Sequence, residues 1–149
     1  MATQDEYAVE LTKQAERTYT RIYDQAQACI GRGDVSNSRV TLLKMVDEVI
    51  DKIIPHDPFH PSRSLSGPLS NIFRISKARM RIFYAASSKA KTIAILFISD
   101  TPRKYGDTRD PYSVFTKLVV SGQFDEVFDR LGVRRPIRET SALQPFQLQ

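Results

Sequence analysis

Arginine and lysine residues gather in a stretch of the chain that otherwise has the pattern of a β-hairpin. Residues 71–84 read NIFRISKARMRIFY and contain Arg74, Lys77, Arg79 and Arg81. Residues 64–90 contain no Asp or Glu, so no carboxylate nearby in the sequence balances these charges. Guanidinium groups stay protonated and form forked hydrogen bonds to phosphate oxygens. The cluster therefore predicts binding to a phosphate group.

The spacing of these cations predicts that they share one face of the hairpin. A two-residue loop at Lys77–Ala78 places Arg74 directly opposite Arg81, and Arg79 joins the same face. Like charges placed opposite each other destabilise a sheet by a few tenths to about 1 kcal/mol. Because stability gives no reason for this arrangement, we interpret the face as one that binds an anion. The alternative is a solvated face, on which arginine stems cover apolar surface.

The segment after the last predicted strand supplies further cations and two tyrosines. Arg103, Lys104, Tyr105 and Arg109 lie in this loop, and Tyr112 stands at the start of a predicted helix. In an antiparallel meander this loop lies at one end of the sheet. A tyrosine there can stack on a base or transfer a proton. Tyr112 fits a buried position on the apolar side of its helix equally well.

Other kinds of site find little support in the sequence. There is no glycine-rich phosphate loop, no HExxH motif and no pair of carboxylates in the basic region. His56 and His60 are separated by proline, which excludes a helical metal pair, so we expect both in a surface loop. His60 leads into the basic region and is an alternative acid or base. The single cysteine, Cys29, is expected in the core. We expect no metal and no cofactor.

The elements that must position these residues follow from hydrophobic periodicity and capping residues. Alternation predicts a strand at 6–11, and the three strands of a meander are expected at 71–76, 79–86 and 91–99. Helices are expected at 12–30, from 36 or 37 to 54, from 111 to about 121, and around 124–131. Thr12 and Asp110 are the expected N-caps, Pro55 ends the second helix, and Gly132 ends the last one. This order predicts an α+β domain, with helices against one face of an antiparallel sheet of about four strands.

Length and charge limit the organisation of the chain. The 149 residues, 41% of them hydrophobic, predict one domain over 1–135 followed by a tail, 136–149, that is poorly ordered without a partner. Residues 61–109 hold ten Lys or Arg and only two Asp or Glu, which favours a polyanion or an acidic protein as partner. The N-terminus has no signal peptide pattern, and the apolar run TIAILFI is too short to span a bilayer. We expect a cytoplasmic protein without membrane association.

Three segments carry a resemblance to a known family. LSGPLSNIFRISKARMRIFY, TIAILFISDTPRKYGD and DPYSVFTKLVVSG resemble toxins of the RelE/ParE superfamily from bacterial type II toxin–antitoxin systems. RKYGDTRDPYSVFTKL is most similar to the YhaV branch. The resemblance implies a RelE-like fold and an endoribonuclease that cleaves mRNA, in many members on the ribosome. It also implies attack by the RNA 2′-OH on the scissile phosphate without a metal.

The resemblance also implies roles for individual residues. Arg74, Arg81 and Arg103 match basic catalytic positions, and the catalytic tyrosine is Tyr105 or Tyr112. Residues expected to bind RNA around them are Lys77, Arg79, Lys104 and Arg109. Ser76 stands where the superfamily has a second lysine. The general base is therefore left open between Lys77 and a tyrosine.

A toxin of this kind implies a cognate antitoxin, and contact with operator DNA only through the toxin–antitoxin complex. Two alternatives belong to other classes. One is a non-enzymatic poison of DNA gyrase, as in the ParE branch. The other is a nucleic-acid-binding module without catalysis.

Overall fold

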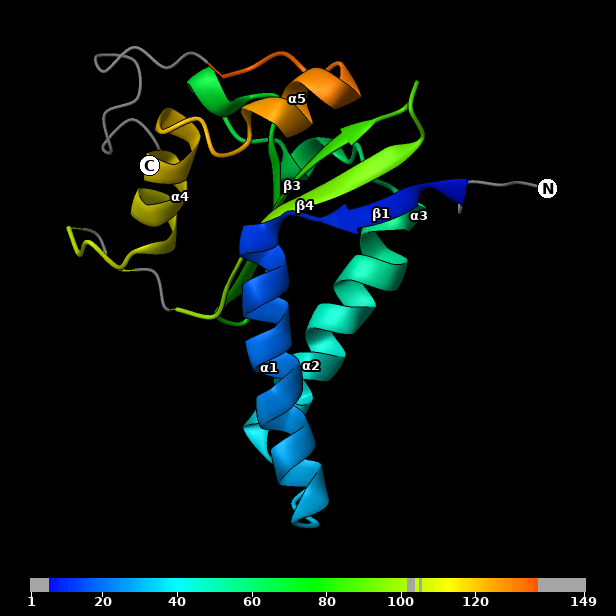
Figure 1. The fold of residues 1–149 in the computed structure, drawn as a ribbon, viewed down its shortest axis with the longest axis vertical. Coiled ribbons are helices and arrows are strands. Elements are labelled where there is room, and N and C mark those ends of the chain that lie inside the picture. Colours follow the sequence, from blue (N-terminus) through cyan, green and yellow to red (C-terminus); the bar gives the residue numbers. More distant parts are fainter. Residues whose placement is uncertain (1–5, 102–103, 105, 137–149) are drawn as a thin grey trace.

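A four-stranded sheet forms the centre of the molecule, in a computed structural model that describes residues 6–101, 104 and 106–136. The strands are β1 (Ala8–Leu11), β2 (Phe73–Lys77), β3 (Met80–Ser87) and β4 (Thr92–Ser99). The larger helices are α1 (Lys13–Gly31), α2 (Ser38–Glu48), α4 (Pro111–Val120) and α5 (Asp125–Leu131). The predicted α+β class and the predicted order of elements are confirmed (Figure 1).

The strand order is β1-β4-β3-β2. The β2–β3 and β3–β4 pairs are antiparallel, as a meander requires, but β1 runs parallel to β4. The expectation of a wholly antiparallel sheet is therefore wrong for its first strand. The two long helices and the hairpin that follow β1 carry the chain back to the strand beside it, which permits a parallel pair.

Helix ends follow the capping residues in the sequence. The Thr12 hydroxyl accepts a hydrogen bond from the Ala15 amide at 3.1 Å and donates one to the Leu96 carbonyl at 2.8 Å, which fixes α1 to β4. Asn37 caps α2, and Gly132 ends α5 with a left-handed φ of 70°. Pro55 does not end the second helix as expected. A π-helical turn over Val49–Ile53 precedes it, and α3 (Ile54–His56) continues the chain.

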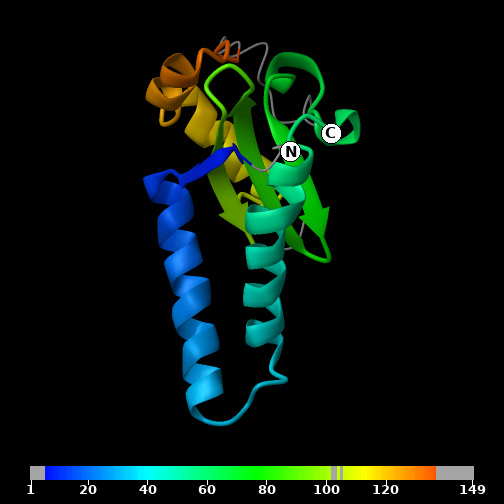
Figure 2. The same ribbon diagram turned by 90° about the vertical axis from the view of Figure 1, so that its right-hand side faces the viewer.

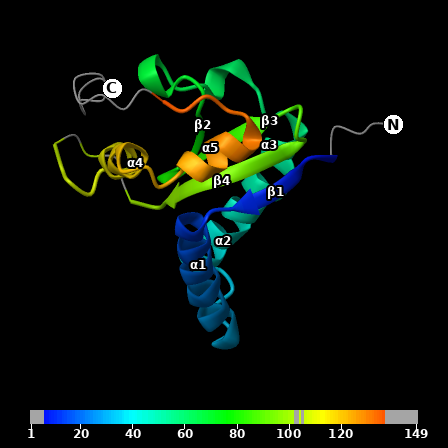
Figure 3. The same cartoon turned by 45° about the horizontal axis from the view of Figure 1, so that its top comes forward.

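Both faces of the sheet are packed. One face carries Ile82, Tyr84 and their neighbours against α1 and α2. The other carries Phe83 and Ala85 against aromatic side chains of the C-terminal helices, such as Phe115. Figure 3 shows α4 and α5 on the opposite side of the sheet from α1 and α2. The expectation of helices on one face alone is therefore wrong.

The second packed face has a physical cause in β3. Phe83 and Ala85 alternate with Ile82 and Tyr84, so the strand is apolar on both sides and needs cover on both. Helices α1 and α2 form an arm that projects well beyond the sheet (Figure 2). Within the residues described, no helix has the length and hydrophobicity to cross a membrane.

Candidate active site at the β2–β3 hairpin

Arg74 and Arg81 lie on the same face of the sheet, on neighbouring strands. Arg74 pairs with Phe83, and Arg81 pairs with Ser76. The two arginines are therefore diagonal neighbours rather than directly opposite, and the predicted register is wrong. The reversal takes place at Ala78–Arg79 instead of Lys77–Ala78, and Ala78 adopts a left-handed φ of 53°. This shift by one residue moves Arg79 out of the strand and into the turn.

Neither arginine has a carboxylate partner among the residues described. Arg74 donates from Nη1 to the Ser76 hydroxyl at 3.2 Å, and Arg81 donates from Nη1 to the Arg79 carbonyl at 3.4 Å. The Nε atoms of both side chains are buried without a hydrogen-bond partner in the described structure. Buried donors in native proteins are normally satisfied. Two arginines on neighbouring strands, each with an unsatisfied buried Nε donor, are therefore the feature of this face that most needs a functional reason.

Four other arginines of the described chain form ion pairs with carboxylates. Arg21 pairs with Asp100 at 3.1 Å, and Arg109 pairs with Asp107 at 3.2 Å. Arg130 and Arg135 also contact carboxylates. Other arginines of the described chain, such as Arg39, also lack a carboxylate partner, but Arg39 is exposed to solvent. Arg74 and Arg81 differ from it because their Nε atoms are buried without a hydrogen-bond partner.

Tyr112 lies at the edge of this pair and belongs to the core as well. Its ring packs edge-on against Phe83, with centroids 5.4 Å apart, and the Arg74 guanidinium carbon lies 5.9 Å from its centroid. The side chain is only 9% exposed. The interpretation of Tyr112 as a core residue of α4 is confirmed, and the ring also lies next to the Arg74 guanidinium. A role in stacking or proton transfer stays a prediction.

Asp110 fixes the start of α4 and with it the position of Tyr112. Its Oδ2 accepts hydrogen bonds from the Tyr112 amide at 3.1 Å and the Ser113 amide at 3.3 Å. Its Oδ1 accepts a bond from the Lys104 amide at 2.7 Å. The predicted cap is confirmed, and the same buried carboxylate also holds the preceding loop against the helix.

The other predicted cations that the structure describes have different surroundings from Arg74 and Arg81. Lys77 alternates onto the opposite face, where its Nζ lies 3.6 Å from the Glu48 carboxylate of α2. Arg79 is exposed in the turn, and the side chain of Lys104 is exposed in the loop. Arg109 contacts Asp107 through two nitrogens and holds the pKa of that carboxyl below its usual range. Arg103 and Tyr105 lie outside the described residues.

Two serines on this face were not identified from the sequence as part of the site. Ser76 accepts the Arg74 hydrogen bond and lies opposite Arg81, although the sequence marked it only as a departure from the superfamily. Ser99, at the end of β4, is the other cross-strand partner of Arg81. The pairings of both serines with Arg81 depend on strand register, and no local signal in the sequence reveals them.

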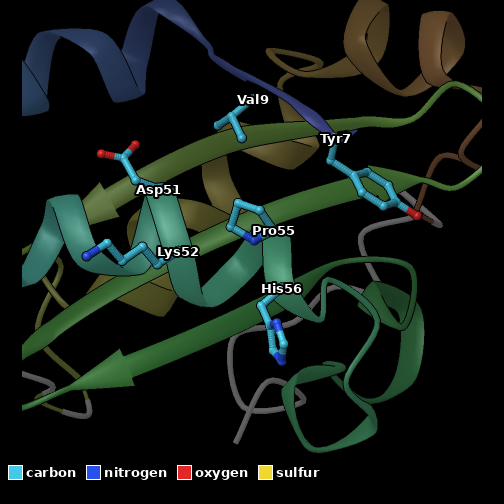
Figure 4. Close-up of a pocket in the computed structure, with 6 residues that line it drawn as sticks. All are labelled: Tyr7, Val9, Asp51, Lys52, Pro55 and His56. Carbon is cyan, nitrogen blue, oxygen red and sulfur yellow. The ribbon is translucent and has the colours of Figure 1, made fainter. Parts of the chain in front are cut away.

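A separate pocket at the opposite end of the sheet does not have the geometry of a reactive site. It measures about 430 Å³ and is lined by Tyr7, Asp51, Lys52, His56 and two apolar residues. Figure 4 shows the side chains of Asp51, Lys52 and His56 pointing in different directions rather than toward one point. No group of three potential metal ligands occurs within the described part of the chain.

One family model and several curated proteins match this chain. Residues 7–135 match the model of a family named for the toxin YhaV and described as toxins with endonuclease activity, of toxin–antitoxin systems. Toxin YhaV of Escherichia coli O6:H1 is 30% identical over 119 residues, which cover 72% of this chain and 77% of that protein. Ribonuclease toxin YhaV of Escherichia coli K12 is 29% identical over the same shares of both chains.

One solved structure shows a weaker likeness. The toxin–antitoxin complex RelBE2 of Mycobacterium tuberculosis contains a chain with a TM-score of 0.47 and 19% identity, over 63% of this chain and 90% of that one. A likeness of this size does not place individual residues. The family match covers nearly all of the described domain, and the chain therefore belongs to the YhaV family of toxins with endonuclease activity from toxin–antitoxin systems.

Proposed function

We propose that this protein is an endoribonuclease that arrests translation by cutting mRNA, and that Arg74 and Arg81 bind the scissile phosphate. The observation that carries this proposal is the pair of buried Nε atoms without partners on one sheet face. The name of the K12 relative, a ribonuclease toxin, supports RNA as the substrate. RNA carries its own nucleophile, the 2′-OH, so the enzyme need not supply one.

The two guanidinium groups supply charge stabilisation. When the 2′-OH attacks phosphorus, negative charge builds up on the non-bridging oxygens. Arg74 and Arg81 lie on adjacent strands, where their Nη groups can donate N–H bonds to those oxygens. Arginine does not lose its proton, so this role needs no change in protonation during the reaction.

Proton transfer needs a different group, and we assign it to Tyr112. The ring of Tyr112 is nearly buried, with Phe83 at its edge and the Arg74 cation near its face. Little of the ring is left for stacking on a base, so a role for the hydroxyl fits better. Lys77, the other candidate base, extends to the opposite face toward Glu48, and this placement favours the tyrosine.

The remaining parts of the proposal concern the partners of the protein and the location where it acts. A toxin of a toxin–antitoxin system has an antitoxin as its partner. We propose that the protein acts on mRNA in the cytoplasm, on the ribosome, and contacts operator DNA only through its antitoxin complex. Arg79, Lys104 and Arg109 are exposed on the hairpin turn and the loop, where they can contact the RNA backbone.

Cleavage of RNA by Arg74→Ala and Arg81→Ala tests this proposal. Arg39→Ala is a matched control, because Arg39 is an exposed arginine of α2, far from the hairpin in the sequence. We expect each hairpin variant to lose about 10²–10³-fold in the rate of the cutting step, the usual effect of removing one donor to a developing anion. The control should cut normally.

The products and conditions give two further readouts. Attack by the 2′-OH predicts 2′,3′-cyclic phosphate ends and no cutting at a 2′-deoxy nucleotide. Because arginines supply the charge stabilisation, we expect the rate of cutting not to depend on which divalent cation keeps the ribosome assembled. Normal cutting by both hairpin variants would refute the proposal. Growth arrest without any RNA cleavage would point to a gyrase poison instead.

A further inference from the structure

A groove lies at the open edge of β4, one strand away from Arg81. The pairing of β1 with β4 ends at Leu11 and Ile95, so in the described chain no strand covers the edge from Phe97 to Ser99. A cavity of about 320 Å³ opens along this edge, between α1, α4 and the segment after β4. Its size suits a small planar ligand.

Ser99 connects this groove to the proposed phosphate site. It is the cross-strand partner of Arg81 and also lines the groove. Cross-strand partners have Cβ atoms about 4.5–5.5 Å apart. If Arg81 binds the scissile phosphate, the nucleotide next to that phosphate lies within reach of the groove.

The charges along the groove favour an uncharged polar group over a second phosphate. Arg21 is paired with Asp100, and Arg109 is paired with Asp107. Both arginines that line the groove are therefore neutralised, in contrast to Arg74 and Arg81. A nucleobase has the polarity and shape that this lining can accept.

Asp100 carries the group best suited to read such a base. Its Oδ1 accepts the Arg21 hydrogen bond at 3.1 Å, and within the described structure its Oδ2 has no partner. Gln14 and Thr18 line the same groove from α1. The Gln14 Oε1 is occupied by Arg17, and this leaves the amide NH₂ of Gln14 as a donor.

We propose that this groove binds the base next to the scissile phosphate, and that Asp100 selects a base with an exocyclic amine. Adenine, cytosine and guanine carry such an amine, and uracil does not. The carboxylate Oδ2 accepts a hydrogen bond from this amine, as acidic side chains accept one from cytosine N4. Gln14 and Thr18 supply further hydrogen-bonding groups to the same base. This inference rests on the proposed ribonuclease activity.

Sequencing the cut ends of an RNA pool, randomised around the cleavage position, tests the inference. The wild type should disfavour uracil at one position next to the cut. Asp100→Asn replaces the free carboxylate oxygen with an amide donor, so we expect the bias against uracil to fall by about tenfold. Asp24→Asn, which removes the same charge from an exposed site on α1, should keep the wild-type bias.

Binding to RNA with a 2′-deoxy nucleotide at the cut provides a second readout if Asp100→Asn cuts too slowly to sequence. Oligonucleotides that differ only in the adjacent base should then bind the wild type unequally and Asp100→Asn equally. No base bias in the wild type, or an unchanged bias in Asp100→Asn, overturns the groove assignment. Normal cutting by Arg81→Ala overturns the phosphate site instead, so the two failures are distinguishable.

Discussion

Replacing Arg81 with methionine should stabilise the fold while abolishing activity. Methionine keeps an unbranched stem of similar length but removes the charge and the unsatisfied Nε donor. The hydrogen bond that is lost, to the Arg79 carbonyl, is long at 3.4 Å. A side chain retained for function at a cost in stability is expected to show this combination.

The expected gain follows from the register. Diagonal neighbours such as Arg74 and Arg81 have backbones about 7–8 Å apart, and we take the same separation for their charges. Two like charges at that distance repel by about 0.5 kcal/mol at the dielectric constant of water and by about 2 kcal/mol at an effective value of about 20. Because both side chains are half-buried, we expect about 1 kcal/mol, or a rise in Tm of about 2–4 °C for a chain of this length.

Urea unfolding at low and high salt measures this effect. At about 1 M salt the Debye length falls to about 3 Å, so the repulsion is screened. The wild type should therefore gain more stability from salt than Arg81→Met does, and Arg39→Met should follow the wild type. A loss of more than about 1 kcal/mol in Arg81→Met would show that Arg81 holds the fold together, which would refute the reasoning.

Three further predictions concern the fold. Gly132→Ala should lower the free energy of unfolding by about 1 kcal/mol in urea unfolding, because Gly132 adopts a left-handed φ of 70°. Phe115→Ala should lower it by about 3–5 kcal/mol in the same assay, since the ring is fully buried and stacks at 4.2 Å on Phe83. Burial raises the pKa of Tyr84, so the unfolded chain loses this proton first, and stability falls as the pH rises above about 10. In pH-dependent melts, Tyr84→Phe should reduce this alkaline loss but cost about 1 kcal/mol at neutral pH, through the lost bond to the Pro58 carbonyl.

Local signals in the sequence predicted several helix ends, although not the one expected at Pro55. Thr12, Asn37 and Asp110 are caps because each has a side-chain oxygen that accepts a hydrogen bond from an amide in the first turn of the helix that follows. Gly132 ends α5 because the backbone there needs a positive φ. These outcomes depend on residues close together in the chain, which is the information that a sequence pattern holds.

The geometry of the site depended on information that the pattern lacks. The observed register of the β2–β3 hairpin differs from the predicted one because Ala78 adopts a left-handed φ. The sequence has no glycine or asparagine at this position to indicate such a turn. That shift paired Arg81 with Ser76 instead of Arg74. The second packed face was missed because the sheet was interpreted as apolar on one side only, although β3 is apolar on both. Arginine clustering on one face was predictable, because alternation alone determines it.

The most direct test of the central claim is an NMR titration of the arginine side chains. The claim is that the guanidinium groups of Arg74 and Arg81 bind the scissile phosphate. Their Nε–Hε signals can be assigned by comparison with Arg74→Met and Arg81→Met, and followed while RNA with a 2′-deoxy nucleotide at the cut is added. We predict that both signals shift together on binding, because phosphate oxygens that bind the exposed Nη groups change the surroundings of the buried Nε atoms. If RNA binds and shifts other arginine signals while these two stay unchanged, the phosphate lies elsewhere and the account is contradicted.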